Sequence, residues 1–103
     1  MKATILLLFT LLFACHTQAQ TIRGQVTDSL THEPLPGATV TLHRGMETFF
    51  LDYAITDAEG RFTFKRSEAK GLNISVTYLG YRKKTTPATG GKDMLVELLP
   101  DAI

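Results

Sequence analysis

The residues of this chain that could bind a metal ion or take part in catalysis are few and widely spaced. Asp57 and Glu59 stand close together in the stretch TDAEGRFTF, residues 56 to 64. A calcium loop of the EF-hand kind needs oxygen ligands at its first, third and fifth positions and a glycine at its sixth. Counted from Asp57, the fifth position is Arg61 and the glycine falls at the fourth, so the spacing argues against a calcium site.

The same residues fit a type I turn that closes a bulged β-hairpin. Asp57 comes first, where its carboxylate can accept backbone N–H bonds, and Gly60 takes the left-handed position. Phe62 and Phe64 follow in alternation with polar residues, and we expect both rings to point into a core. This stretch therefore predicts a structural hairpin.

The remaining candidates for catalysis are two histidines. A catalytic zinc ion needs three protein ligands around an open position. Beyond the N-terminal segment the histidines are His32 and His43, neither of which begins an H-x-x-E pattern, and we expect both to be exposed. The serine motif G-x-S-x-G does not occur. The sequence therefore predicts a protein that is not an enzyme and has neither a metal site nor a cofactor.

Residues 1 to 19 have the pattern of a secretory signal peptide. Lys2 precedes an uncharged apolar run, ATILLLFTLLFA, which is shorter than the ~20 residues of a membrane span. Cleavage after Ala19 would start the mature chain at Gln20. Export is therefore expected, which in a bacterium with two membranes leads to the periplasm or the outer membrane.

The cysteine offers an alternative fate for this segment. LFAC, ending at Cys15, loosely resembles the lipobox at which bacterial lipoproteins are cleaved and acylated. Phe13 is bulky where that motif usually has a small or β-branched residue. A lipid on Cys15 is therefore the minor alternative to cleavage after Ala19.

Composition narrows the class of partner. Removing residues 1 to 19 leaves 84 residues with ten basic and ten acidic side chains and without cysteine. A formal charge of zero gives no bulk attraction to nucleic acid or an anionic membrane. We expect a monomer of one domain, residues 20 to 103, that meets a protein partner in the cell envelope. Contact with a membrane would need a lipid on Cys15 or a further domain.

Seven short strands account for nearly all of this domain. Turn clusters separate runs in which apolar and polar residues alternate. This pattern is typical of a two-layered antiparallel sandwich in which each sheet has one solvent-exposed face. The expected strands are residues 21–28, 38–44, 49–56, 61–65, 72–79, 81–86 and 93–99. RSEAKG, residues 66–71, is too short for a stable helix and is expected to be a loop.

Two further turns carry recognisable chemistry. Leu35, Pro36 and Gly37 begin a tetrad with proline second and glycine third, which predicts a type II turn with Leu35 closing one end of the core. Gly80 interrupts two strand-like runs and predicts a bulge or tight bend. Tyr81 is then expected to be an aromatic anchor whose hydroxyl bonds to nearby backbone.

Strict alternation places four large apolar residues on the solvent-exposed side of their strands. Irregularities near Phe50 and Gly80 are expected to bury them, and an exposed apolar patch that binds a partner is the alternative. The four residues are Phe50, Leu79, Leu95 and Leu99. The cations at 82–84 are expected on an edge strand, where charge discourages pairing with another chain.

The ordered set of motifs resembles a known family. IRGQVTD, THEPLPGATVTL, AITDAEGRFTF, ISVTYLGY and MLVELLP together look like the carboxypeptidase regulatory-like domain. The resemblance covers nearly all of the mature chain and implies a seven-strand, transthyretin-like Greek-key sandwich. Transthyretin-like hydrolases differ, because they end in a YRGS-like motif where this chain has YRKK at 81–84 and a further strand.

The resemblance also implies a function. Such domains commonly stand at the N-terminus of TonB-dependent outer-membrane receptors for nutrients, including glycan receptors of the starch-utilisation type. They follow a signal peptide and precede a plug and a barrel, which this sequence does not contain. Two readings stay open: an N-terminal piece of such a receptor, or a stand-alone secreted or lipid-anchored module that binds a protein or a glycan.

Overall fold

The chain folds into seven strands arranged in two sheets. The computed structural model describes residues 21–46, 49–66 and 68–101. The strands are β1 (Ile22–Asp28), β2 (Thr39–Arg44), β3 (Asp52–Ile55), β4 (Arg61–Phe64), β5 (Leu72–Thr77), β6 (Lys84–Pro87) and β7 (Asp93–Leu98). All seven predicted strands are confirmed, with ends shifted by up to three residues. The described part of the chain holds no helix with the length and hydropathy needed to cross a bilayer.

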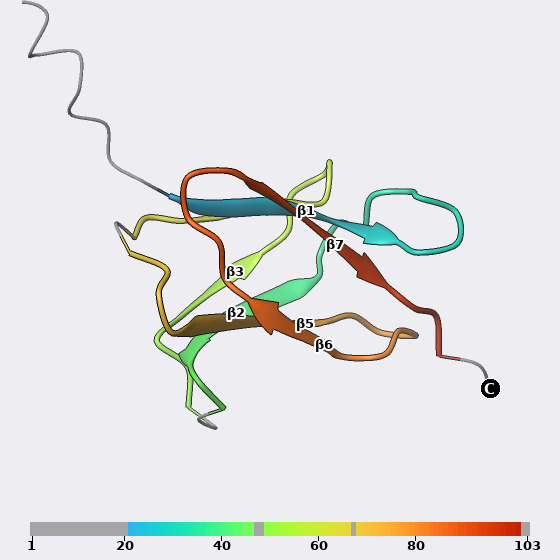
Figure 1. The fold of residues 1–103 in the computed structure, drawn as a ribbon. Coiled ribbons are helices and arrows are strands. Elements are labelled where there is room, and N and C mark those ends of the chain that lie inside the picture. The colour runs from blue at the N-terminus through green and yellow to red at the C-terminus, as the bar shows by residue number, and fades with distance from the viewer. Residues whose placement is uncertain (1–20, 47–48, 67, 102–103) are drawn as a thin grey trace, which may run out of the picture.

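The two sheets form the layers of a sandwich. One sheet has the strand order β4-β1-β7 and the other β3-β2-β5-β6. Figure 1 shows β1 and β7 side by side in one layer, with β2, β5 and β6 in the layer below. Two hairpins, β2–β3 and β5–β6, stay within one sheet, and the remaining connections pass between the layers.

One pairing differs from the antiparallel sandwich that the sequence predicts. β1 and β7 run parallel, with Arg23 opposite Asp93 and Asp28 opposite Leu98. Two parallel neighbours need a long connection between them. The first and last strands meet this condition because the rest of the domain connects them. The other described pairs are antiparallel.

The core follows from alternation along the strands. The inward residues of both sheets are apolar, and each of the following is at most 7% exposed: Ile22, Val26, Leu35, Ala38, Val40, Leu42, Phe62, Phe64, Leu72, Ile74, Val76, Val96 and Leu98. The rings of Phe62 and Phe64 lie 6.0 Å apart on β4. Full burial of one such side chain contributes about 1.5–3 kcal/mol, so this layer dominates the stability of the domain.

The predicted turn at Asp57 is confirmed, but the expectation that it closes a hairpin is wrong. β3 pairs with β2 in one sheet and β4 pairs with β1 in the other, so the turn connects the two layers. The Gly60 amide donates to the Asp57 carbonyl at 2.9 Å, and the Asp57 carboxylate accepts the amides of Glu59 and Arg61 at 3.0 and 2.8 Å. Gly60 has φ 73°, in the left-handed region. Its carbonyl accepts the amide of Val26 at 2.8 Å, which fastens the turn to β1.

The turn at Leu35 is closed through a side chain. Gly37 has φ 83°, as a type II turn requires, and Leu35 is buried in the core. The Thr56 hydroxyl donates to the Leu35 carbonyl at 2.6 Å and accepts the Ala38 amide at 2.8 Å. Pro36 is exposed at the corner of this turn. Thr56 therefore bridges the two ends of the tetrad.

A tight bend at Gly80 is also confirmed, but the expected partner of Tyr81 is wrong. The Tyr81 amide donates to the Tyr78 carbonyl at 3.0 Å, which closes a turn around Gly80. The Tyr81 hydroxyl donates to the Asp28 carboxylate at 2.6 Å rather than to nearby backbone. A charged acceptor from the end of β1 lies within its reach, and bonds to ionised acceptors are stronger than those to neutral ones.

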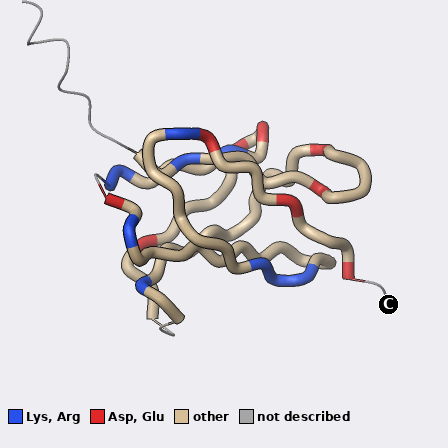
Figure 2. Tube along the Cα trace, viewed as in Figure 1, with Lys and Arg blue, Asp and Glu red and all other residues tan. Residues whose placement is uncertain are grey.

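The cations at 82–84 enter an edge strand, as the sequence predicts. β6 is the outer strand of the four-stranded sheet, and Figure 2 shows the run of cations along the lower side of the molecule. Lys84 Nζ donates to the Glu97 carbonyl at 3.4 Å, and Arg82 Nε lies 3.8 Å from an Asp101 carboxylate oxygen. The Lys84 contact links the edge of one sheet to β7 of the other, and the Arg82 contact joins the segments just outside these two strands.

Candidate functional site

Polar side chains line up across the outer face of the four-stranded sheet. Residues at odd positions of β2 and β5 point outward because their even-numbered neighbours fill the core. The register places Thr41 opposite Ser75, and Ser75 opposite Thr85. Three hydroxyl groups on three adjacent strands therefore form a row, and His43 lies one step along β2.

His43 is buried in this row, which corrects the expectation of an exposed residue. It is 7% exposed, and its Nε2 lies 2.8 Å from the Ser75 hydroxyl. Its Nδ1 lies 2.9 Å from the Gly45 carbonyl, and Ser75 Oγ lies 2.9 Å from Thr85 Oγ1. Strand alternation predicts a solvent-exposed side chain for His43. The neighbouring polar groups allow burial because they satisfy both ring nitrogens.

The direction of these hydrogen bonds follows from the Gly45 carbonyl. A carbonyl can only accept, so Nδ1 of His43 carries the hydrogen and Nε2 of the neutral ring is an acceptor. The Ser75 hydroxyl therefore donates to Nε2, and the Thr85 hydroxyl donates to Ser75 Oγ. We call this chain of His43, Ser75 and Thr85 the hydroxyl relay.

The relay forms the floor of a hollow of about 240 Å³. The other lining residues are Thr41, Met46, Phe50 and Lys83. Phe50 is 54% exposed and Met46 is 82% exposed, so apolar walls stand beside the polar floor. The Phe50 and Tyr53 rings meet edge to face at 6.2 Å and 78°, an arrangement that favours a fixed ring position.

The hollow favours binding over nucleophilic catalysis. The contact of Ser75 with His43 resembles a nucleophile and its base. Acyl transfer also needs hydrogen-bond donors directed at the developing oxyanion. Ser75 lies on β5, which pairs with β2 on one side and β6 on the other, so the sheet uses the backbone amides around it. The buried side chains therefore present a fixed polar surface.

A second polar cluster lies at the end of β1. Asp28 accepts the amides of Leu30 and Thr31 at 2.7 and 3.0 Å, in addition to the Tyr81 hydroxyl. The Tyr81 hydroxyl bond, followed by the two amide bonds, lowers the pKa of Asp28 below its ordinary value of 3.8. The same bond raises the pKa of Tyr81 above its ordinary value of 10.0. The cluster closes the 28–34 loop against the opposite sheet.

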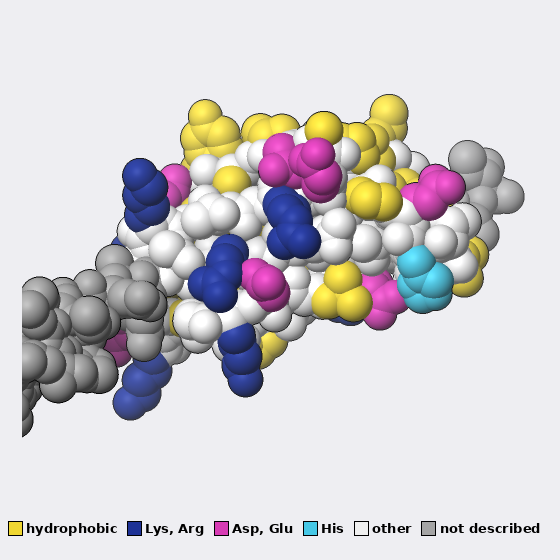
Figure 3. Space-filling view, turned by 90° about the horizontal axis from the view of Figure 1, so that it is seen from above, with side chains coloured by type: hydrophobic (Ala, Val, Ile, Leu, Met, Phe, Trp, Pro, Cys, Tyr) yellow, Lys and Arg dark blue, Asp and Glu magenta, His cyan; other side chains and the backbone are white. Residues whose placement is uncertain are grey.

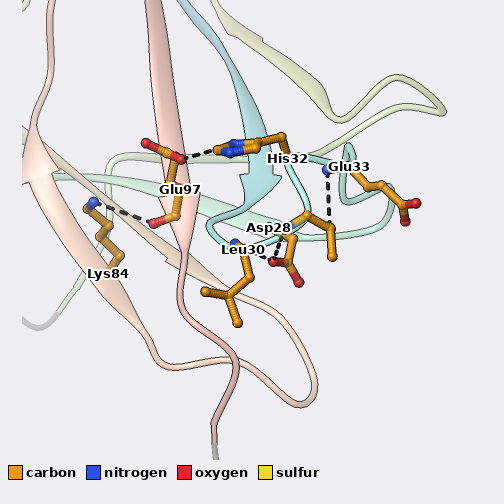
Figure 4. A network of polar contacts seen from close by, with 7 residues as sticks. Asp28, Leu30, His32, Glu33, Lys84 and Glu97 are labelled. Atoms are coloured by element: carbon orange, nitrogen blue, oxygen red, sulfur yellow. Dashed lines mark hydrogen bonds and ion pairs between the residues drawn. The ribbon is translucent and has the colours of Figure 1, made fainter.

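His32 belongs to the rim of that loop. Figure 4 shows its ring pointing toward Glu97 of β7, with Nδ1 3.5 Å from a carboxylate oxygen. The His32 side chain is 74% exposed, as the sequence predicts. Within residues 21–46, 49–66 and 68–101, no three His, Cys, Asp or Glu side chains group as a metal ion would need.

The four apolar residues predicted to be buried are exposed, and they do not form one patch. Their exposed fractions are 54% for Phe50, 96% for Leu79, 64% for Leu95 and 45% for Leu99. Phe50 lines the hollow on the four-stranded sheet, whereas Leu95 projects from the other side of the sandwich, since Val96 and Leu98 fill the core. On the face seen in Figure 3, charged side chains of both signs separate apolar ones.

Several residues that the sequence singled out lie where they were expected. Asp57, Gly60, Phe62, Leu35 and Gly37 occupy the predicted turns and core. Cys15, Ala19 and Gln20, the residues of the predicted processing sites, lie outside the described residues.

Sequence reasoning missed Ser75, Thr85 and Thr56. His43 and Ser75 both occupy outward-facing positions of their strands, and this pattern could have indicated that they share one face. Only the register between the strands shows that they are in contact.

Comparison with known proteins gives one match. A family model described as the carboxypeptidase regulatory-like domain matches residues 21–97, which includes every strand except the last residue of β7. A search of curated proteins finds no match.

Proposed function

The chain belongs to the carboxypeptidase regulatory-like domain family, and from this membership we propose that it is a non-catalytic binding or accessory module of the cell envelope. The family match across residues 21–97 is the observation that carries the proposal, because it assigns nearly all of the described chain to one regulatory-like β-sandwich. The fixed polar surface over β5 supports a binding role.

The more specific proposal is the N-terminal extension domain of a TonB-dependent outer-membrane receptor for nutrient uptake. The matched region begins two residues after the expected cleavage site, directly behind the signal-peptide pattern of residues 1 to 19. This order is the one that the family resemblance implies for such receptors. In this role the sandwich lies in the periplasm, where strand edges and loops contact the plug or an associated envelope protein.

A second candidate function is a stand-alone secreted or lipid-anchored module. The LFAC stretch ending at Cys15 favours it, because acylation there would tether the sandwich to a membrane through a short connection. In this role the domain would bind its protein or glycan partner without a barrel.

The gene downstream of the codon for Ile103 distinguishes the two candidates. The receptor proposal predicts that the reading frame continues into a plug and a barrel in the source genome. In-frame deletion of residues 21–97 from that gene should leave the barrel in the outer membrane and reduce nutrient-dependent growth. A stop codon followed by an unrelated gene would overturn the receptor proposal and favour the stand-alone module.

A further inference from the structure

We propose that the hollow on the four-stranded sheet binds one saccharide unit, whose hydroxyl groups donate hydrogen bonds to Thr85 and Thr41. This site gives a ligand class to the binding role proposed for the module and rests on that role, and it applies equally to the receptor domain and to the stand-alone module.

The relay directs hydroxyl hydrogens into the protein. The Thr85 hydroxyl donates to Ser75 Oγ, and the Ser75 hydroxyl donates to Nε2 of His43. Thr41 donates to the Ser75 carbonyl at 3.3 Å. The threonine oxygens that line the hollow therefore offer lone pairs, and a complementary ligand must supply the donors. A set of hydroxyl groups meets this requirement, whereas an ionised carboxylate supplies only acceptors.

The walls of the hollow fit the two other surfaces of a sugar ring. The exposed face of Phe50, held by its contact with Tyr53, offers an apolar surface for the C–H groups of the ring. Lys83, which directly precedes β6, also lines the hollow and adds an ammonium donor. That donor can serve a ring oxygen, a hydroxyl oxygen or the carboxylate of an acidic sugar.

The size of the hollow limits the ligand to one unit. Pockets for drug-sized ligands measure ~300–1,000 Å³, so a hollow of about 240 Å³ suits a monosaccharide or the end of a chain. Burial of His43 and Ser75 fixes the floor before any ligand arrives, which lowers the ordering cost of binding. A small, partly open contact surface predicts a dissociation constant in the millimolar range.

Nuclear magnetic resonance tests this site directly. The protein is labelled with ¹⁵N, purified after expression of the full sequence, and titrated with methyl glucoside, methyl galactoside and glucuronate. We expect saturable amide shifts at Thr41, Ser75 and Thr85 with at least one of these sugars. Permethylated glucose, which has the same ring but no hydroxyl donors, should give no such shifts.

Matched variants assign the contacts. Thr85→Val removes the outward lone pairs from an exposed strand position and should weaken binding about tenfold, the effect of one lost hydrogen bond. Phe50→Ala should weaken binding by a similar factor. Leu95→Ala, on the other side of the sandwich, is the control and should leave the affinity unchanged.

Two results would overturn the proposal. One is the absence of shifts at these amides with all three sugars at tens of millimolar. The other is an equal response to permethylated glucose, which would mean that hydroxyl donors play no part. Retained dispersion of the amide spectrum shows that each variant is folded, so a loss of binding can be attributed to the site.

Discussion

At the scale of single residues, one hydroxyl joins two distant turns. Thr56 is buried and follows β3, where it satisfies the Leu35 carbonyl and the Ala38 amide at once. Its own amide donates to the Ala38 carbonyl at 2.9 Å. The residue before the Asp57 turn therefore also fixes the turn that precedes β2.

Thr56→Val should lower the free energy of unfolding by about 2–4 kcal/mol. Valine fills the same volume but leaves a buried carbonyl and a buried amide without partners, at about 1–3 kcal/mol each. Urea unfolding followed by circular dichroism measures the change. Thr56→Ser keeps the hydroxyl and should cost about 1 kcal/mol for the lost methyl group. Equal losses in the two variants would contradict a bridging role for the hydroxyl.

Tyr81→Phe should lower stability most in the neutral range and should flatten the dependence of stability on pH. The lowered pKa of Asp28 means that its contribution is present above its ordinary value of 3.8 and is lost as the pH falls through the folded value. The raised pKa of Tyr81 means that its contribution is present below its ordinary value of 10.0 and is lost as the pH rises through the folded value.

The melting temperature as a function of pH measures this effect. The difference between the wild-type protein and Tyr81→Phe should be largest in the neutral range and should shrink under acidic and strongly alkaline conditions. Tyr53→Phe, an exposed tyrosine on β3, is the matched control and should show little difference. A difference that stays constant from acid to alkaline pH would show that the Asp28 bond does not cause it.

Single residues were the least predictable from sequence. The sequence assigns His43 to the wet side of β2, and it cannot show that Ser75 lies opposite that strand 32 positions later. Likewise, Tyr81 and Asp28 are 53 positions apart. Partners at such distances depend on the register between strands, which local periodicity does not specify.

At the scale of elements, the turn at Asp57 has two reasons to require glycine. Gly60 has a left-handed φ of 73°, and a Cβ at this position would lie 2.6 Å from the Val26 carbonyl oxygen. The turn therefore packs directly against β1. A substitution there disturbs both the turn and the strand pairing beside it.

Gly60→Val should unfold the domain or cost about 4 kcal/mol or more, since left-handed strain and the clash with Val26 add together. Glu59→Gln changes an exposed side chain and should stay within about 0.5 kcal/mol of the wild-type protein. Thermal unfolding of both variants provides the comparison. A stable Gly60→Val variant would contradict the turn geometry.

Strands and turns were more predictable than pairings. Asp57 and Gly60 are close in sequence, so turn chemistry alone predicts their turn. It does not show that this turn joins two sheets and closes no hairpin. The parallel alignment of β1 with β7 was not predictable in this way. It joins the two ends of the domain, and apolar alternation is the same for parallel and antiparallel neighbours.

At the scale of the whole molecule, the sandwich keeps its two outer faces chemically distinct. The four-stranded sheet carries the hydroxyl relay and the apolar wall at Phe50. Leu95 stands on the other side, where Arg23 pairs with Asp93 at 2.8 Å and charges of both signs are exposed. Alternation predicted which positions face outward, but not which face would hold a hollow.

Export to the cell envelope remains the central claim about the whole chain, because both proposed roles require it. The most direct test is the intact mass of the protein recovered from fractionated cells that express the full sequence. The account predicts an envelope fraction in which the mature chain begins at Gln20, and a diacylated or triacylated Cys15 would select the lipid-anchored role. A cytoplasmic protein that retains residues 1 to 19 would contradict the account.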